Sequence, residues 1–125
     1  SEIMITGDQI RADTIYEGSV DRLVKKNIKT RPGLGFLKNS IIDQHFVVRS
    51  RYNRLLTLLS EYPDKKGVGI DEATAIFVEK GQAEVIGESQ VILFSAPKNI
   101  NSSNKIKIGS LRMSIFTEGD KFKIK

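Results

Sequence analysis

The chain has 125 residues, 39% hydrophobic content and a net charge of +5, which is enough for one domain with a buried core and too short for two. It contains no cysteine, which excludes disulfides and thiolate metal sites, and a lone histidine among scattered carboxylates does not favour zinc. No apolar run approaches the ~20 residues of a membrane span, and the first residues lack a signal-peptide pattern. We therefore treat residues 1–125 as a single domain or fragment, and we expect no cofactor.

The first half of the chain mixes short strand-like and helical segments. The clearest helix shows apolar residues at spacings of three and four, and a proline follows it directly. In chain order, the pattern predicts the end of a buried element at 1–6, a loop at 9–18, a short helix from Ser19 to about Asn27, a turn at 30–37, a strand at Ile41–Ile42 and a helix from about Val48 to Tyr62.

The second half of the chain predicts strands almost throughout. Tight turns at Lys80-Gly81 and Gly87-Glu88 favour a meander of three strands, and a run of asparagine and serine predicts a later loop. In order, we expect strands at 68–70, 75–79, 83–86 and 90–95, a loop at 99–104, and strands at 106–108, 111–116 and 121–124.

The positive net charge does not by itself indicate nucleic-acid binding. The chain has no tryptophan and few aromatic residues, so a basic strand with stacking side chains is missing. Alternating lysines on terminal strands more often keep a sheet edge from pairing with another chain. We expect neither nucleic acid nor a membrane as a partner. The lysines concerned are Lys25, Lys26, Lys29, Lys105, Lys107, Lys121, Lys123 and Lys125.

The segment from Ile41 to Leu59, I-I-D-Q-H-F-V-V-R-S-R-Y-N-R-L-L-T-L-L, holds the only histidine in the chain. An apolar strand leads into Asp43, Gln44 and His45, and three arginines follow. Polar side chains of this kind at a strand-to-helix corner are typical of an active site. On this segment alone, a structural histidine bonded to backbone and solvated helix arginines remain the alternative.

Glu72 ends a second apolar run, G-V-G-I-D-E from Gly67. Two strands that end in acid and imidazole groups would meet along one edge of a parallel sheet. A carboxylate there would accept the imidazole N–H, fix its tautomer and stabilise the imidazolium, which is the supporting half of a nucleophile–base–acid triad. We therefore expect His45 and Glu72 to be hydrogen-bonded neighbours.

The run D-Q-H-F, then R-x-R-x-x-R-L-L, then G-I-D-E-x-T-A resembles cyanophycinase and its relatives in the serine peptidase family that includes aspartyl dipeptidase. The resemblance covers about Gly33 to Leu93 and fades on both sides. It implies an α/β fold, namely the C-terminal part of a flavodoxin-like or class I glutamine amidotransferase-like three-layer sandwich, with a β-rich C-terminal meander.

By this resemblance, His45 is the catalytic base and Glu72 is its acidic partner. Guanidinium groups bind carboxylates in a bidentate way, so the arginines suit a peptide rich in aspartate. The implied substrate is cyanophycin, an aspartate backbone carrying arginine on its side-chain carboxyls, cut to β-aspartyl-arginine; a small aspartyl dipeptide is the second choice. The implied substrate-binding residues are Asp43, Gln44, Arg49, Arg51 and Arg54.

The nucleophile of that family is a serine in a G-x-S-x-G elbow, and no serine of this chain has those flanking glycines. In the family the elbow lies upstream of the base, and the opening S-E-I-M-I resembles the stretch just after it. We therefore expect the C-terminal part of a longer enzyme, which supplies base, acid and arginines while a missing N-terminal part carries the serine. The isolated chain should then lack peptidase activity.

Two other functions stay open, a catalytically dead relative and a noncatalytic module that binds acidic peptides through the arginines. A two-chain enzyme made by cleavage near Ser1 is not distinguished from a truncated protein. Besides the acidic or β-aspartyl peptide and the missing N-terminal part, a homodimer is an open partner. No compartment follows from the sequence; the cytoplasm is favoured, and secretion stays open if the intact protein has a signal peptide.

Overall fold

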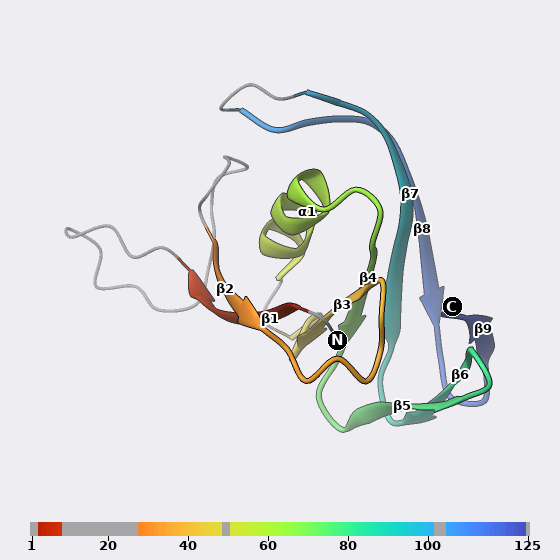
Figure 1. Cartoon of the computed structure of the whole chain (residues 1–125). Helices are drawn as coiled ribbons and strands as arrows, with labels where there is room; N and C mark the ends of the chain where they lie inside the picture. The colour runs from red at the N-terminus through yellow and green to blue at the C-terminus, as the bar shows by residue number, and fades with distance from the viewer. Residues whose placement is uncertain (1–2, 9–27, 49–50, 102–104, 125) are drawn as a thin grey trace.

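The computed structural model of the chain describes residues 3–8, 28–48, 51–101 and 105–124. Within these residues, six strands form one sheet in the order β2-β1-β3-β4-β7-β8 and three form another in the order β5-β6-β9. Figure 1 shows α1 against one face of the larger sheet, with the smaller sheet at the lower right. The elements are β1 (Ile3–Asp8), β2 (Ile28–Pro32), β3 (Ser40–Gln44), α1 (Tyr52–Glu61), β4 (Lys66–Ile70), β5 (Thr74–Glu79), β6 (Gln82–Gly87), β7 (Val91–Asn101), β8 (Lys107–Phe116) and β9 (Lys121–Lys123).

The larger sheet is the middle of three layers, as the side chains of β7 demonstrate. Ile92 and Phe94 pack into the cluster beneath α1, with the helix leucines. Val91 and Leu93 alternate with them and pack into a second cluster with residues of β6 and β9. Since successive strand residues point to opposite faces, α1 and the smaller sheet cover opposite sides. The predicted α/β fold class with a β-rich C-terminal part is confirmed.

Three parallel strands form the part of the sheet that carries the polar residues. β1 is parallel to β3, and β3 is parallel to β4 through α1, which crosses over one face of the sheet. In the β3–β4 register Gln44 lies opposite Ile70. The residues that follow β3 and β4 therefore emerge side by side at one edge, which is where ligands bind in open α/β sheets.

The helix α1 begins at Tyr52, later than the predicted start at Val48. The reason is that the preceding backbone groups are engaged elsewhere. The N–H of Val48 donates to the Asp71 carboxylate at 3.0 Å, and the N–H of Arg51 donates to the Phe46 carbonyl at 3.0 Å. The far end of the helix falls within one residue of the prediction.

The strand β7 departs from the predicted meander. β5 and β6 form the expected hairpin, but β7 pairs with β4 and β8 in the larger sheet. Residues Val91–Phe94 are buried in succession, as in a strand covered on both faces. β7 also continues to Asn101, where turn-forming residues predict a loop, because residues 98–101 pair with β8.

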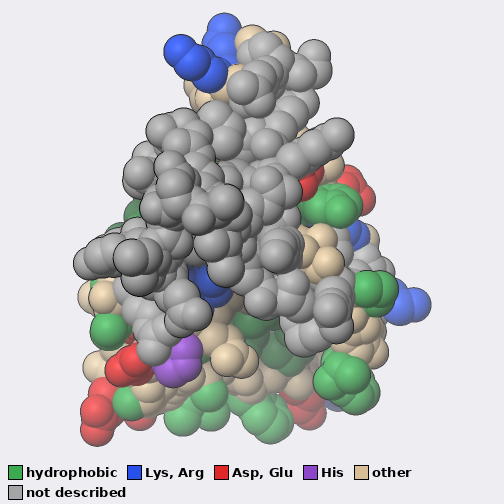
Figure 2. Space-filling view, turned by 90° about the vertical axis from the view of Figure 1, so that its left-hand side faces the viewer, with side chains coloured by type: hydrophobic (Ala, Val, Ile, Leu, Met, Phe, Trp, Pro, Cys, Tyr) green, Lys and Arg blue, Asp and Glu red, His purple; other side chains and the backbone are tan. Residues whose placement is uncertain are grey.

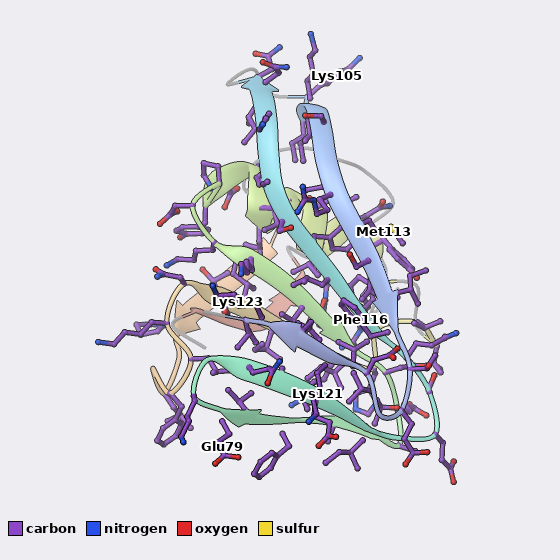
Figure 3. The ribbon with its side chains drawn as sticks, turned by 90° about the vertical axis from the view of Figure 1, so that its right-hand side faces the viewer. Glu79, Lys105, Met113, Phe116, Lys121 and Lys123 are labelled. Atoms are coloured by element: carbon purple, nitrogen blue, oxygen red, sulfur yellow. The ribbon has the colours of Figure 1, made fainter. Side chains whose placement is uncertain are left out.

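β8 and β9 lie at sheet edges, as the lysine pattern predicts. Lys107, Lys121 and Lys123 are exposed, and Figure 3 shows Lys105 at the far end of the β7–β8 hairpin. Charged side chains at such edges hinder pairing with another chain. The loop predicted at 9–18 and the helix predicted from Ser19 lie outside the described residues.

Candidate active site

A sharp backbone turn at His45 ends β3. This residue has a φ of 52°, in the left-handed region that few residues other than glycine adopt and that clusters at functional sites. The next residue, Phe46, is fully buried and donates its N–H to the Ile70 carbonyl at 3.2 Å. Its ring covers Gly69, where an added Cβ would lie 2.3 Å from the ring. The inward position of Phe46 thus leaves His45 facing outward.

His45 and Glu72 meet at the ends of the parallel strands β3 and β4. The distance from His45 Nδ1 to Glu72 Oε1 is 3.0 Å, so the predicted contact is present. Both side chains are nearly half exposed, at 46% and 47%, and Figure 2 shows the purple histidine at the surface beside red acidic side chains. A carboxylate only accepts hydrogen bonds, so the ring donates through Nδ1–H and leaves Nε2 available as an acceptor.

Asp43 forms a buried ion-pair cluster with two arginines. Its side chain is fully buried, and those of Arg51 and Arg54 are 12% and 11% exposed. Arg54 binds both carboxylate oxygens, with Nε at 2.7 Å from Oδ2 and Nη2 in close contact with Oδ1. Arg51 Nη1 lies 3.8 Å from Oδ1 and donates to the Gln44 carbonyl at 2.8 Å. The cluster ties the end of β3 to the first turn of α1.

The structure brings together most of the predicted substrate-binding residues. Gln44 is exposed at the end of β3, next to His45. Its backbone carbonyl accepts the hydrogen bond from Arg51. Asp43 is buried, and its carboxylate contacts the slightly exposed side chains of Arg51 and Arg54. Arg49 lies outside the described residues, so its place in the pocket stays a prediction.

Asp71 and Ser89 join this site although the sequence did not single them out. The Asp71 carboxylate accepts the N–H of Val48 at 3.0 Å and the Ser89 hydroxyl at 2.5 Å, and the Asp71 N–H donates to the Gln90 carbonyl at 3.2 Å. Ser89 lies just before β7, far along the chain from the D-Q-H-F run. The signal for Asp71 was available, because it precedes Glu72 at the end of an apolar strand.

Burial acts to raise the pKa of Asp71. Hydrogen bonds from the Ser89 hydroxyl and from the backbone N–H groups of Val48, Glu72 and Val47 outweigh it and hold the pKa below its ordinary value. The group is therefore an anion at neutral pH, and it accepts several hydrogen bonds at once. Beside it lies a polar hollow of about 390 Å³ lined by Gly87, Glu88, Ser89, Gln90, Thr117 and Glu118.

Metal binding and membrane insertion find no support in the described part of the chain. Among those residues there is no group of three or more histidine, cysteine, aspartate or glutamate side chains placed to hold a metal ion. The helix seen there also lacks the length and apolar character that crossing a bilayer requires.

Comparison with known proteins identifies the family. Residues 4–86, more than half of the chain, match the model of Peptidase family S51. The chain belongs to this family. Among curated S51-like relatives, the cyanophycinases of Synechococcus elongatus and Thermosynechococcus vestitus are 36% identical to it over 102 residues, which covers 74% of this chain and 31% of each relative. The cyanophycinase of Geminocystis herdmanii is 35% identical over 98 residues, covering 72% and 36%.

The resemblance to cyanophycinases that the motifs indicate is thus confirmed, and with it membership of a peptidase family. This S51 chain spans about a third of the length of the curated relatives it matches. The matched range contains His45 and Glu72, whereas Ser89 lies just beyond it. The catalytic roles of the site residues remain predictions.

Proposed function

We propose that this chain supplies the general base and its acidic partner for peptide hydrolysis by a serine nucleophile carried on another segment. The observation that carries the proposal is the 3.0 Å contact between His45 Nδ1 and Glu72 Oε1. With Nδ1–H held by the carboxylate, Nε2 presents a lone pair to an incoming hydroxyl. Membership of a peptidase family supports this chemistry.

In the proposed reaction, the serine oxygen attacks an amide carbonyl while His45 Nε2 takes the hydroxyl proton. Glu72 stabilises the imidazolium that results, and Nε2 then gives the proton to the leaving amine. Water then attacks the acyl-serine ester while Nε2 takes its proton, and the acyl group leaves as the serine hydroxyl is restored. The oxyanion would be bound by backbone N–H groups near the nucleophile, on the segment that carries it.

The proposed substrate class is a peptide rich in aspartate carboxylates, cyanophycin or a β-aspartyl peptide. Two guanidinium groups, of Arg51 and Arg54, lie at the end of β3 beside Asp43, and guanidinium groups bind carboxylates in a bidentate way. Asp43 is buried and would act by holding the two arginines, while the exposed Gln44 would contact the substrate directly. The relatives compared above are named cyanophycinases, which supports this substrate.

A noncatalytic module for acidic peptides is the second candidate, because the same arginines would serve binding without hydrolysis. The two candidates differ in what happens once a serine is supplied. We propose that residues 1–125 are the C-terminal part of a longer peptidase, so the missing segment decides between them.

The test joins the part of the Thermosynechococcus vestitus relative that precedes the matched region to this chain. The chain alone and the chimera are incubated with cyanophycin, and released β-aspartyl-arginine is measured. We expect no turnover by the chain and hydrolysis by the chimera. In the chimera, His45→Ala should lower kcat by roughly 10²–10⁴-fold, the usual contribution of a general base, and Glu72→Gln should also lower kcat.

Asp120→Asn is the matched control, because it removes an exposed carboxylate that accepts the N–H of Thr117 at 2.9 Å and makes no described hydrogen bond to His45 or Glu72. It should leave kcat unchanged. Turnover by the isolated chain would refute the proposal that the nucleophile lies on another segment. Full activity of the His45→Ala chimera would refute the role of His45 as the general base. A chimera that binds cyanophycin without cutting it would favour the second candidate.

A further inference from the structure

The side chains of His45 and Glu72 need other residues to hold them in a fixed orientation. Both side chains are nearly half exposed, and an exposed ion pair contributes only ~0–1 kcal/mol of its own. General-base catalysis nevertheless requires the imidazole to be held within hydrogen-bond reach of a reacting proton. The groups that fix this geometry must therefore lie behind the pair, in the buried part of the corner.

Asp71 is the buried group that contacts both sides of the corner. It is 6% exposed and is adjacent in the chain to Glu72. Its Oδ1 accepts the N–H of Val48 at 3.0 Å, three residues after His45. One carboxylate thus binds the turn that follows the histidine and belongs to the backbone that carries the glutamate.

Ser89 closes the same network from a third segment. Its hydroxyl donates to Asp71 Oδ2 at 2.5 Å, and its N–H donates to the Thr74 hydroxyl at 3.0 Å. Thr74 in turn donates its hydroxyl to the Glu72 carbonyl at 2.9 Å. The backbone of Glu72 is therefore held on both sides, by Asp71 before it and by Thr74 and Ser89 after it.

We propose that Asp71 and Ser89 are positioning residues that orient the His45 ring toward Glu72 and so set its tautomer. The inference rests on the proposed function, since the tautomer matters only if Nε2 accepts a proton. Through Val48, Asp71 fixes the left-handed turn at His45. Through the hydroxyl of Ser89, the Asp71 carboxylate is kept in one orientation. The buried negative charge also disfavours any conformation that would leave Asp71 without its donors.

The test uses the tautomer of the imidazole, which a merely structural residue would not change. His45 is the only histidine in the chain, so its ring ¹⁵N signals need no assignment. They are recorded on the 125-residue chain at about pH 9, well above the ordinary imidazole pKa. We expect the wild type to favour the Nδ1–H form, and Glu72→Gln to lose that preference.

The positioning residues are then changed one at a time. Ser89→Ala keeps the charge of Asp71 and should lower the ratio of Nδ1–H to Nε2–H at least about twofold, the lower end of coupling within one hydrogen-bond network. Ser89→Thr restores the hydroxyl and should recover the ratio. Asp71→Asn should lower it about tenfold, as expected for loss of a hydrogen bond to a charged group.

Ser60→Ala is the matched control, because it removes a buried hydroxyl that donates to the Thr57 carbonyl at 2.6 Å on α1; it should leave the ratio unchanged. An unchanged ratio in a folded Ser89→Ala chain overturns the inference even if Asp71→Asn fails to fold. If Ser89→Ala has no effect while Glu72→Gln does, only the positioning roles are refuted. If Glu72→Gln has no effect, the proposed base–acid pair itself fails.

Discussion

Asp43→Asn offers the strictest test of how the corner is held together. The substitution keeps the shape of a side chain that is fully buried and removes the charge that faces Arg51 and Arg54. Breaking a buried ion pair from one side costs ~3–5 kcal/mol, because the remaining charge stays buried without compensation. The side chains of Arg51 and Arg54 are each about a tenth exposed to solvent, and Arg51 keeps its bond to the Gln44 carbonyl. We therefore expect the lower end of that range, ~3 kcal/mol.

Urea unfolding of the chain measures this cost. With a slope of ~1–3 kcal/mol per M for a small domain, a loss of ~3 kcal/mol lowers the midpoint by about 1–3 M. Asp120→Asn, which removes a charge that accepts only exposed hydrogen bonds from Thr117, should lower the midpoint far less. Arg54→Met made in the Asp43→Asn background should cost less than it does alone, since contacting residues are not additive. A midpoint within about 0.3 M of wild type for Asp43→Asn would refute the buried cluster.

Two further predictions concern stability. Hydrogen bonds lower the pKa of Asp71 in the folded state, so the ionised side chain contributes to folding stability above the unfolded pKa of ~3.9, and this contribution is lost as pH falls through the lower folded pKa. The difference in unfolding free energy between wild type and Asp71→Asn should therefore close below about pH 4. A difference that stays constant down to pH 2 would contradict this prediction. Gly69→Ala should lower the free energy of unfolding by ~1–3 kcal/mol, and by more than Gly67→Ala in the same urea assay. The Cβ added at Gly69 would lie 2.3 Å from the Phe46 ring, whereas the Cβ added at Gly67 would lie 3.1 Å from a Leu55 carbon.

The contact between His45 and Glu72 could be predicted because its signal is local. His45 and Glu72 each follow an apolar strand, and parallel strands joined by a helix end at the same edge of a sheet. Their contact follows from two short motifs and one topological rule. The same rule places Gln44 at the surface, where β3 ends.

The buried cluster was predictable in principle, although the motifs alone pointed to a substrate pocket. Side chains alternate along a strand, so Asp43 shares a face with Ile41, which packs beneath α1. A carboxylate on that face is buried under the helix and requires cationic partners. Arg51 and Arg54 lie three residues apart and thus on one side of the helix start.

The position of β7 and the part played by Ser89 depend on contacts between distant segments. The turn Gly87-Glu88 has the composition of a hairpin, so local pattern favours a meander. The competing signal is the continuous apolar run of Val91–Phe94, which is typical of a strand buried on both faces. Ser89 reaches Asp71 only because β7 pairs with β4, and no short-range spacing encodes that contact.

On the proposed function, the geometry of the pair also restricts the direction from which a nucleophile would approach. The two ring nitrogens of His45 point in different directions, and Glu72 occupies the Nδ1 side. A serine hydroxyl must therefore approach from the Nε2 side, to about 3 Å. β3 and β4 are parallel, and the imidazole and the carboxylate follow their ends, so the serine would have to reach this same edge of the sheet.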